Sequence, residues 1–334
     1  MLLAGDVGGT KTILAVYSRE GGPYTPVAKT EVHSAGYASL TAIAEEFLTQ
    51  VKVSVDRGCF SVAGPVMDGR AKITNLPWVI DESTVANELK LESVHLMNDL
   101  EAIAFAVPGL RADDLRTINV GAPVPRGAIA VIAPGTGLGE SFLTWEGSRY
   151  ITHPTEGGHC SYAPTDETQL GLLAFMLKRF QHVSYEHVCS GIGLPHIYEY
   201  LRSSGSARET PEVAQAMAAA SDPSPTIIKF ALNPVHPCGL CAAALHIFAS
   251  ILGDEAGNLA LKVLATGGIY LAGGMATHAL PALESQGFMQ AFTNKGRFAQ
   301  LMGRMPIHVI VIRAALAGAA GFGLENFMPG SEHG

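Results

Sequence analysis

The stretch Leu3–Tyr17 reads LAGDVGGTKTILAVY, and the interpretation of the whole chain starts from it. An apolar run leads into a Gly- and Thr-rich turn, and a second short apolar run begins at Ile13. A P-loop requires glycine directly before the lysine and a helix after it, whereas here Thr10 precedes Lys11 and β-type residues follow. The stretch therefore predicts a β-hairpin whose turn exposes backbone N–H groups and the hydroxyls of Thr10 and Thr12 to a phosphate.

The same arrangement recurs at Ala128–Trp145, AIAVIAPGTGLGESFLTW, where an apolar run meets a second glycine-rich turn at Gly135–Gly139. The glycine spacing differs from that of the dinucleotide-binding fingerprint, and the strand-like run Ser141–Trp145 follows in place of a helix. Each turn alone can be an ordinary structural hairpin, but two of them in one chain are far more specific. The repeat indicates two duplicated halves that face a cleft.

The composition is that of a folded globular protein. Its 334 residues, 48% of them hydrophobic, are enough for two domains of ordinary size. Only 16% of the residues are charged and the net charge is −8, so no basic field attracts nucleic acid or anionic lipid. We recognise no signal-peptide pattern and no apolar stretch of bilayer length, and we expect a cytoplasmic protein without nucleic-acid or membrane partners. The five cysteines do not form the pattern of a disulfide framework.

Short Val- and Ile-rich runs alternate with longer Ala- and Leu-rich stretches of helical periodicity, which is typical of the α/β class. The predicted strands are Leu2–Val7, Cys59–Ala63, Val94–Met97, Ala128–Ala133, Ile269–Ala272 and Ile307–Ile312. The predicted helices are Ser39–Val51, Glu167–Phe180, Cys241–Leu264 and Ala314–Phe327. The Ser, Glu and Pro residues of Arg202–Asn233 indicate a surface helix and loops.

Asp6 stands directly before the first turn, where a bare carboxylate would repel the phosphates of a nucleotide. A divalent cation or its hydration shell between the two groups removes that repulsion, so Asp6 is a candidate for positioning Mg²⁺ indirectly. An aspartate also caps turns with its own side chain, and this structural alternative stays open.

Taken together, these residues resemble the sugar kinase/actin/Hsp70 superfamily and, within it, the bacterial-type glucokinases. The first phosphate motif is Asp6–Thr10, the second is Pro134–Gly139, and Leu271–Met275 resembles the adenosine motif. Further matches follow in order along nearly the whole chain, at Ala63–Pro65, Thr74–Trp78, Asn98–Ala102, Glu156–His159, Ser184–Val188, Ser190–Leu194, Gly257–Ala260 and Lys295–Phe298. The resemblance implies an α/β protein with the two-domain actin-like ATPase fold, which is ribonuclease H-like, and an interdomain cleft.

The resemblance also implies the domain boundaries and the activity. The small α/β domain comprises residues 1–110 plus 313–330, because the C-terminal helix returns to it, and the large α/β domain comprises residues 111–312. Closure of the domains over the sugar would exclude water and protect ATP from hydrolysis. The implied enzyme is a glucokinase, which uses ATP and Mg²⁺ to phosphorylate glucose at the 6-hydroxyl, giving glucose 6-phosphate and ADP in the first step of glycolysis. A homodimer through the large domain is implied as well.

A hexose is recognised by carboxylates, amides and an imidazole that converge on its hydroxyls. Asp99 lies between an apolar strand and a helical run, a position from which a side chain can project beyond the end of a sheet. The resemblance makes Asp99 the catalytic base that takes the proton of the hydroxymethyl group, while Asn98 holds a neighbouring hydroxyl. Alternatively, Asp99 caps the helix that begins near Leu100. The implied substrate-binding residues are Asn75, Asn98, Asp99, Glu156, His159 and Glu186.

For the nucleotide, the resemblance implies phosphate contacts from both turns and an adenosine contact from a Gly-Gly pair. Thr136 offers the best single hydroxyl in the second turn, and glycines let the adenosine approach the backbone closely. Alternatively, the pair Gly273-Gly274 is the glycine-rich end of a strand. The segment Ser190–Gly193 is either the start of a helix or a turn. The implied nucleotide-binding residues are Asp6, Gly8, Gly9, Thr10, Lys11, Gly135, Thr136, Gly137, Gly273 and Gly274.

Two possible zinc sites are under-supplied with ligands. Glu156 and His159 are one acid and one histidine without a second pair at ligand spacing. Cys238 and Cys241 form a single CxxC pair without the further cysteines of the related repressor/open-reading-frame/kinase family, and we interpret them as structural thiols. The alternatives to a glucokinase are a kinase for another hexose or with another phosphoryl donor, and a sugar-responsive ATPase or regulator of the same fold.

Overall fold

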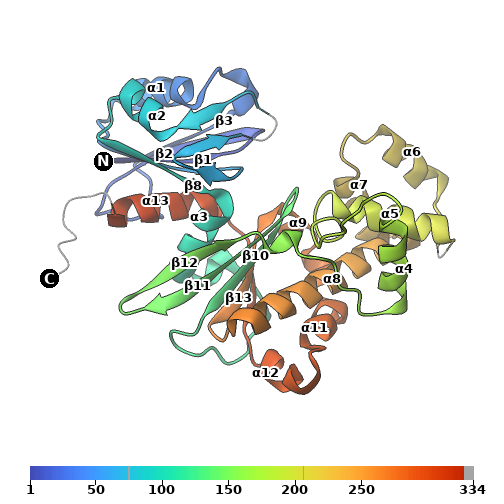
Figure 1. Ribbon diagram of the computed structural model, residues 1–334. Coiled ribbons are helices and arrows are strands. Elements are labelled where there is room, and N and C mark those ends of the chain that lie inside the picture. The colour runs from blue at the N-terminus through green and yellow to red at the C-terminus, as the bar shows by residue number, and fades with distance from the viewer. Residues whose placement is uncertain (74–75, 206, 327–334) are drawn as a thin grey trace. The chain divides into compact units, whose positions relative to one another are not determined.

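The computed structural model describes residues 1–73, 76–205 and 207–326 (Figure 1). These residues divide into two compact units. Unit 1 contains Met1–Arg111 and the described residues from Ile312 onward, and unit 2 contains Ala112–Val311. The chain therefore leaves unit 1 after its first part and returns to it for its last helix.

The main sheet of unit 1 has the strand order β3-β2-β1-β4-β8. Strands β3, β2 and β1 pair antiparallel, whereas β1, β4 and β8 pair parallel. Side chains along a strand point alternately to opposite faces, so the apolar run of β1 supplies both faces of the sheet. The strands are β1 Leu2–Val7, β2 Lys11–Tyr17, β3 Ala28–His33, β4 Arg57–Val62 and β8 Ser93–Asn98.

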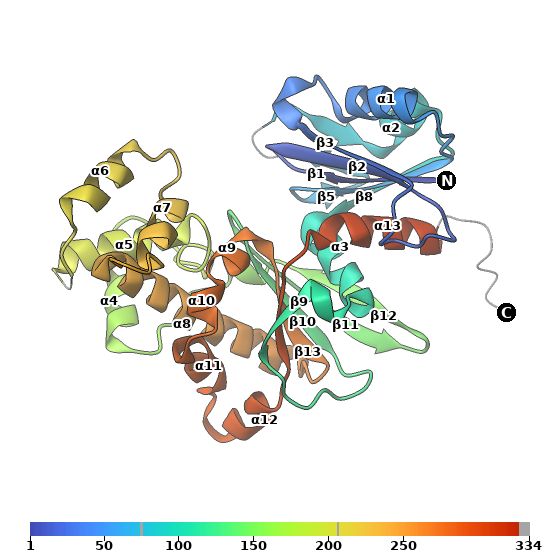
Figure 2. The same ribbon diagram turned by 180° about the vertical axis from the view of Figure 1, so that it is seen from behind.

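Helices cover both faces of this sheet, as the two opposite views show (Figures 1 and 2). Leu3 and Val7 pack with residues of α1 and α2 on one face, and Leu2 and Ala4 pack with residues of α3 and α13 on the other. These helices are α1 Leu40–Val51, α2 Glu82–Leu89, α3 Asp99–Ala106 and α13 Ala314–Asn326. Unit 1 also contains β5 Val66–Met67, β6 Arg70–Lys72, β7 Val79–Asp81 and the 3₁₀ turns η1 Ser34–Gly36 and η2 Val107–Gly109.

Helix α13 consists largely of alanine and glycine, which lets its backbone lie against α3. A Cβ atom at Gly318 would overlap the carbonyl oxygen of Ala102 in α3. A backbone atom cannot turn aside as a flexible side chain can, so glycine is required at this crossing. The last helix is therefore held on unit 1 by shape as well as by the burial of its apolar side chains.

The sheet of unit 2 has the strand order β12-β11-β10-β13-β14-β9. Strands β12, β11 and β10 pair antiparallel and β10, β13 and β14 pair parallel, which repeats the arrangement of β3, β2, β1, β4 and β8 in unit 1. The duplication predicted from the two hairpins is confirmed. The strands are β9 Leu115–Asn119, β10 Ile129–Pro134, β11 Leu138–Glu146, β12 Arg149–Thr155, β13 Gly268–Leu271 and β14 Ile307–Ile310.

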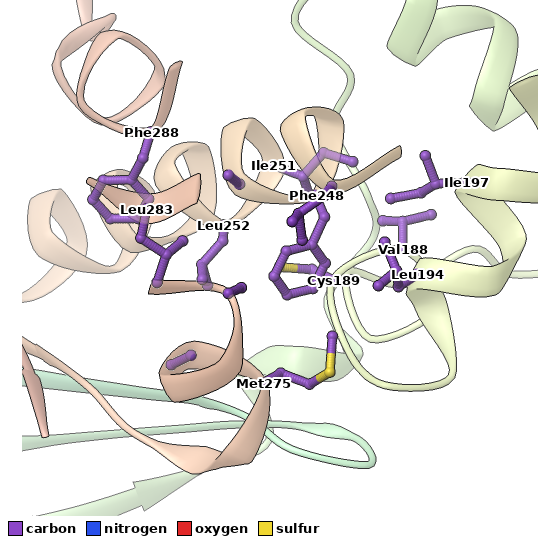
Figure 3. Close-up of a cluster of buried hydrophobic side chains, with 14 of the residues drawn as sticks. Val188, Cys189, Leu194, Ile197, Phe248, Ile251, Leu252, Met275, Leu283 and Phe288 are labelled. Atoms are coloured by element: carbon purple, nitrogen blue, oxygen red, sulfur yellow. The ribbon is translucent and has the colours of Figure 1, made fainter. Parts of the chain in front are cut away.

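The helices of unit 2 form an apolar core around α8, part of which is drawn in Figure 3. Phe248 and Leu252 of α8 belong to this core together with Val188, Ile197 and Met275. The helices are α4 Glu167–Met176, α5 Gly193–Ser204, α6 Pro211–Ala219, α7 Pro223–Ala231, α8 Gly239–Val263, α9 Gly273–His278, α10 Leu280–Leu283, α11 Gln286–Thr293 and α12 Ala299–Gly303, with 3₁₀ turns η3 Ala112–Asp114, η4 Gly157–His159 and η5 Gly296–Phe298.

Helix α8 is long and apolar enough to cross a membrane by length and composition, which differs from our expectation that no stretch qualifies. In this structure it is a core helix, because 67% of its apolar window is buried and α5, α7 and α11 pack against it. A helix that is apolar on all sides is expected at the centre of a large core.

The predicted α/β class and the predicted strands and helices are confirmed, with ends that differ by a few residues. The largest difference is in α4, which ends at Met176 instead of Phe180. The interpretation of Arg202–Asn233 as a surface helix and loops is wrong in one respect. Helix α7 in this range buries Ile227 and Ile228 in the core of unit 2, because its apolar residues recur at helical spacing.

Candidate functional site

The first predicted turn is a β-hairpin, as its sequence indicates, since β1 ends at Val7 and β2 begins at Lys11. The backbone N–H of Gly8 donates to the carbonyl oxygen of Lys11 at 3.0 Å and closes the turn. Gly8 and Gly9 are partly exposed and Thr10 is exposed. A phosphate can therefore reach the backbone of this turn and the hydroxyl of Thr10 at the surface of unit 1.

The expectation that Thr12 exposes its hydroxyl is wrong. Its side chain is fully buried, and its hydroxyl oxygen lies 2.9 Å from that of Ser34. The Ser34 hydroxyl donates to the carbonyl oxygen of Gly8 at 2.8 Å, and the Ser34 N–H donates to that of Thr10 at 3.0 Å. Sequence reasoning missed Ser34 because it lies directly after β3, in the turn η1, outside every motif. It supports the first turn from inside unit 1.

Two cations lie close to the first turn. Lys11 forms an ion pair with Glu31 in which Nζ and Oε1 are 2.6 Å apart, and Arg313 lies 3.4 Å from the other oxygen of Glu31. Both pairs are partly exposed and add little to stability. Positive charge here nevertheless favours a phosphate at the turn. Arg313 was not among the predicted site residues, and a single arginine before the last helix offers no sequence motif that identifies it.

Asp6 lies in β1, opposite Ser61 of β4. Burial, together with the negative charge of Asp99, raises the pKa of Asp6 to about 6, and Arg313 opposes the shift. The buried hydroxyl of Ser61 has no partner of strict hydrogen-bond geometry among the described residues, but it lies beside the Asp6 carboxyl group and its interaction with that group lowers the pKa of Asp6. Carboxylate and hydroxyl oxygens are the donors that Mg²⁺ prefers, so this corner of unit 1 fits a magnesium ion.

A metal at this corner would have few protein ligands. In residues 1–73, 76–205 and 207–326 there is no group of three or more His, Cys, Asp or Glu side chains that could hold a metal ion. Mg²⁺ keeps several waters and is commonly bound through one or two carboxylates together with phosphates of the substrate.

Asn98, not Asp99, is the N-cap of α3. The Asn98 Oδ1 atom accepts the N–H of Leu100 at 2.9 Å, and its Nδ2 atom donates to the carbonyl oxygen of Gly64 at 2.9 Å. Asp99 is the first residue of α3, and its Oδ1 atom also accepts the Leu100 N–H, at 2.8 Å. Burial raises the pKa of Asp99 above its ordinary value. Since Asn98 is the N-cap, capping of α3 does not by itself explain why position 99 is an aspartate.

The second predicted turn joins β10 to β11 in unit 2. The N–H of Gly135 donates to the carbonyl oxygen of Gly137 at 2.9 Å, and Thr136 is exposed. The N–H groups of Gly191 and Ile192 donate to the carbonyl oxygens of Gly135 and Thr136 at 2.8 and 3.2 Å. The segment that sequence reasoning left open between a helix start and a turn is therefore a turn that supports the second hairpin and leads into α5.

The Gly-Gly pair after β13 begins helix α9 and is not a strand end. Gly273 has a φ angle of +85°, and a Cβ atom there would lie 2.6 Å from the carbonyl oxygen of Pro134, at the end of β10. Glycine is therefore required at this close approach. The exposed Gly274 lies next to it, so the two glycines that we predicted to contact adenosine lie beside the second turn.

Glu156, His159 and Glu186 come together around the start of β11. Glu156 directly precedes the turn η4 and His159 is its last residue, with side chains 84% and 60% exposed and with Oε2 of Glu156 3.9 Å from Nε2 of His159. The N–H of Glu186 donates to the carbonyl oxygen of Gly158 at 2.9 Å, which joins the two segments. The Oε2 atom of Glu186 accepts the N–H of Leu138 at 3.0 Å. The predicted sugar residues of unit 2 thus adjoin the second turn.

The remaining predicted residues are placed as follows. Asn75 lies outside the described residues. Cys238 and Cys241 are buried free thiols, and Cys241 lies in the first turn of α8. This agrees with their interpretation as structural thiols.

Comparisons with known proteins agree along nearly the whole chain. A family model described as Glucokinase matches residues 3–325. A glucokinase of Nostoc punctiforme is 38% identical over 336 residues, covering 96% of this chain and 98% of the relative. The crystal structure of a glucokinase from an Antarctic psychrotroph has a TM-score of 0.82 at 29% identity, covering 97% of this chain and 98% of that chain.

A more distant structure adds to the evidence on the fold. A ROK family glucokinase from Streptomyces griseus, in complex with glucose and AMPPNP, has a TM-score of 0.63 at 18% identity and covers 96% of this chain and 98% of that chain. At this identity the likeness is one of fold alone. With the repeated sheet arrangement of units 1 and 2, these structures show the two-domain actin-like ATPase fold.

Proposed function

The chain belongs to the glucokinase family, and from this premise we propose that it transfers the γ-phosphoryl group of ATP to the 6-hydroxyl of glucose. The products are glucose 6-phosphate and ADP. The observation that carries the proposal is the bond between the Glu186 carboxylate and the N–H of Leu138. This bond holds a carboxylate that can bind sugar hydroxyls next to a turn that can bind phosphates. A sugar kinase needs both groups side by side, whereas an ATPase without a sugar substrate does not.

In this proposal, Glu156, His159 and Glu186 bind the hydroxyls of glucose. The exposure of Glu156 and His159 supports the role, because both side chains can reach a ligand without first breaking a buried contact. Carboxylates accept hydrogen bonds from sugar hydroxyls, and the imidazole can donate or accept. Asn98 is a further sugar ligand, and Asn75, outside the described residues, stays a prediction.

Asp99 is the proposed catalytic base. It takes the proton of the 6-hydroxyl as the sugar oxygen forms a bond to the γ-phosphorus, while the bond from that phosphorus to the bridging oxygen breaks and ADP leaves. A carboxylate whose pKa is raised by burial is a stronger base than a free aspartate, which supports the role. Its place at the first residue of α3, at the end of β8, fixes the side chain.

We propose nucleotide contacts in each unit separately. Backbone N–H groups of Gly8–Thr10 and Gly135–Gly137 hold the phosphates, Lys11 adds positive charge, and Gly273 and Gly274 contact the adenosine. Asp6 is the residue that would hold Mg²⁺, indirectly. When bound, Mg²⁺ neutralises negative charge on the transferred phosphoryl group. The fit of Mg²⁺ to the oxygens near Asp6 supports this assignment.

We also propose that the enzyme acts in the cytoplasm as a homodimer that contacts through unit 2, without nucleic-acid or membrane partners. The family resemblance supports these assignments, and the net charge of −8 agrees with the absence of a nucleic-acid partner. A molar mass from light scattering near twice that of the 35.1 kDa chain is the expected result. A molar mass equal to that of the monomer at micromolar protein concentration would contradict the proposed homodimer.

Initial rates of ADP formation from Mg-ATP test the function, with glucose, mannose, fructose, N-acetylglucosamine or no sugar. We expect the rate with glucose to be the highest and to exceed the rate without sugar by about 100-fold or more. An enzyme whose site forms hydrogen bonds with the hydroxyls of its substrate discriminates strongly against water as the phosphoryl acceptor. A higher rate with another sugar would assign another hexose. Sugar-independent ADP release would indicate an ATPase, and no release with any sugar would contradict the kinase.

Replacing Glu156 with glutamine is expected to raise the KM for glucose by about 10- to 100-fold with a smaller change in kcat. The amide keeps the shape of the side chain but loses the charge that strengthens its hydrogen bonds to hydroxyls. Glu167→Gln, at an exposed position in the first turn of α4, is the control and should leave KM unchanged. An unchanged KM in Glu156→Gln would exclude Glu156 as a sugar ligand.

A further inference from the structure

Two buried carboxyl groups of unit 2, those of Glu140 and Glu255, are not used by the mechanism above. Glu140 lies on β11 just after the second turn and is 1% exposed, and Glu255 lies on α8 and is 0% exposed. Two carboxylates buried beside each other are costly unless their charge is reduced or compensated. Burial and the charge of Glu255 raise the pKa of Glu140, so Glu140 keeps its proton at neutral pH.

The hydrogen-bonding pattern of the two carboxyl groups is compatible with one proton shared between them. In the described part of the chain, Oε1 of Glu140 and Oε1 of Glu255 are buried and have no hydrogen-bond partner of strict geometry. A side-chain hydrogen bond between the two carboxyl groups is one of the causes that raise the pKa of Glu140. The Lys262 Nζ atom lies 3.5 Å from Oε1 of Glu255, but this side chain is 54% exposed, so its charge is largely screened. A protonated carboxyl group is a donor, and its O–H can satisfy an oxygen of the other carboxylate.

Glu140 contacts the segment that carries Glu156 and His159. A Cβ atom at Gly157 would overlap the Oε2 atom of Glu140, so the loop backbone rests on this carboxyl group. Thr155 is the cross-strand neighbour of Glu140. Its hydroxyl donates to the Glu140 carbonyl oxygen at 3.0 Å and accepts the Gly157 N–H at 3.1 Å.

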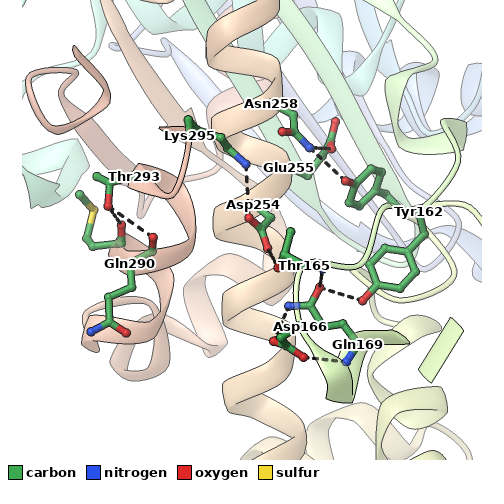
Figure 4. A network of polar contacts seen from close by, with 12 residues as sticks. Tyr162, Thr165, Asp166, Gln169, Asp254, Glu255, Asn258, Gln290, Thr293 and Lys295 are labelled. Atoms are coloured by element: carbon green, nitrogen blue, oxygen red, sulfur yellow. Dashed lines mark hydrogen bonds and ion pairs between the residues drawn. The ribbon is translucent and has the colours of Figure 1, made fainter. Parts of the chain in front are cut away.

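Glu255 is linked through Asn258 to the segment that carries Glu186. Its Oε2 atom accepts a hydrogen bond from Nδ2 of Asn258 at 3.0 Å, and the same amide donates to the hydroxyl of Tyr185 at 3.0 Å (Figure 4). Tyr185 directly precedes Glu186 in the chain. The two carboxyl groups therefore contact both segments on which the sugar residues stand.

We propose that Glu140 and Glu255 share one proton and that this pair positions the two segments carrying Glu156, His159 and Glu186. The inference rests on the proposed function, since it concerns the affinity of the same site for glucose. Loss of the shared proton places two negative charges under Gly157 and beside Asn258. Their repulsion moves the segments apart and weakens the binding of glucose.

Among the described residues, the other titratable groups that interact with the pair are Lys262, Tyr185 and Cys189. Burial raises the pKa of the Tyr185 hydroxyl and of the Cys189 thiol, so both stay neutral while the pair titrates. A change in glucose affinity between neutral and moderately alkaline pH is thus assigned to the carboxyl pair.

The test measures KM for glucose, kcat and Tm from pH 6.5 to 9.5 in the wild type and in Glu140→Gln. In the wild type, KM should rise by up to about tenfold per pH unit above the raised pKa, because binding requires one proton. The glutamine amide always donates to Glu255, so the KM of the variant should match the wild type at neutral pH and stay within about twofold at alkaline pH. Glu146→Gln, at the exposed end of β11, is the matched control and should follow the wild type.

The sign of the stability change is fixed by the raised pKa. The contribution of protonated Glu140 is fully present below the ordinary glutamate pKa and is lost as pH rises through the raised value. The Tm of the wild type should therefore fall relative to that of Glu140→Gln as pH increases. If Tm depended on pH in the same way in the two proteins, the proposal of a shared proton would be wrong.

The kinetic result separates positioning from a purely structural role. A difference in Tm profiles without a difference in KM profiles would overturn the positioning role. A parallel alkaline rise of KM in both proteins would do the same. If the wild type forms no ADP in response to glucose, the proposed function fails, and the Tm profiles still decide whether the proton is shared.

Discussion

Replacing Asp99 with asparagine is expected to lower kcat for glucose phosphorylation by about 10³-fold and to change the KM for glucose by less than about threefold. Asparagine has the same shape, and its Oδ1 atom can still accept the N–H of Leu100 as that of Asp99 does. The amide cannot take the proton of the 6-hydroxyl. The loss therefore concerns the transition state and not the binding of sugar, and steady-state kinetics with Mg-ATP and glucose measure it.

Glu101→Gln is the matched control for this variant. Glu101 is the other acidic residue in the first turn of α3, so its replacement removes a similar negative charge from the same end of the helix. That change costs at most about 1 kcal/mol of stability and should leave kcat within about twofold. Near-normal turnover in Asp99→Asn, or an equal loss of kcat in Glu101→Gln, would exclude Asp99 as the base.

Replacing Gly318 with alanine is expected to destabilise the protein by about 2 to 3 kcal/mol, which corresponds to a fall in Tm of roughly 5 to 10 °C. The added methyl group would overlap the carbonyl oxygen of Ala102, so α13 has to move away from α3. That movement opens the face of the unit 1 sheet to which Leu2 and Cys59 belong. Calorimetry of the purified variant measures the change.

Gly321→Ala, in the same helix, separates crowding from helix propensity. The nearest atom to a Cβ at Gly321 is a ring carbon of Phe105 at 3.2 Å, which belongs to a side chain that can shift. Alanine also gains about 1 kcal/mol of helix propensity over glycine, so this variant should be nearly as stable as the wild type or more stable. If Gly318→Ala were as stable as Gly321→Ala, the close contact between α13 and α3 would not exist in solution.

The hairpins were predictable from sequence because their determinants are local. A glycine-rich turn between two short apolar runs fixes strand, turn and strand within one stretch, so Leu3–Tyr17 and Ala128–Trp145 were interpreted correctly. The role of Thr12 was not predictable. Its hydroxyl is buried against Ser34, and that contact depends on how β3 pairs with β2, which no local pattern encodes.

The site was predictable only in part, for the same reason. Motif matches identified Glu156, His159 and Glu186, and the structure brings these three together around Leu138. Arg313 is far along the chain from Asp6 and reaches it only because α13 returns to unit 1. Glu255 lies in a long apolar run where a lone acid carries no pattern, and its meeting with Glu140 depends on the packing of α8 on β10.

The return of α13 to unit 1 has a consequence for biosynthesis. Residues of β1, β2 and β4 leave the ribosome early, but part of the apolar face they form is covered by a helix made after all of Ala112–Val311. At ordinary rates of translation this delay is roughly 10 to 40 s. Unit 2 is contiguous and can fold during that time, whereas the incomplete sheet of unit 1 presents Leu2, Ile13 and Cys59 to chaperones until the last helix emerges.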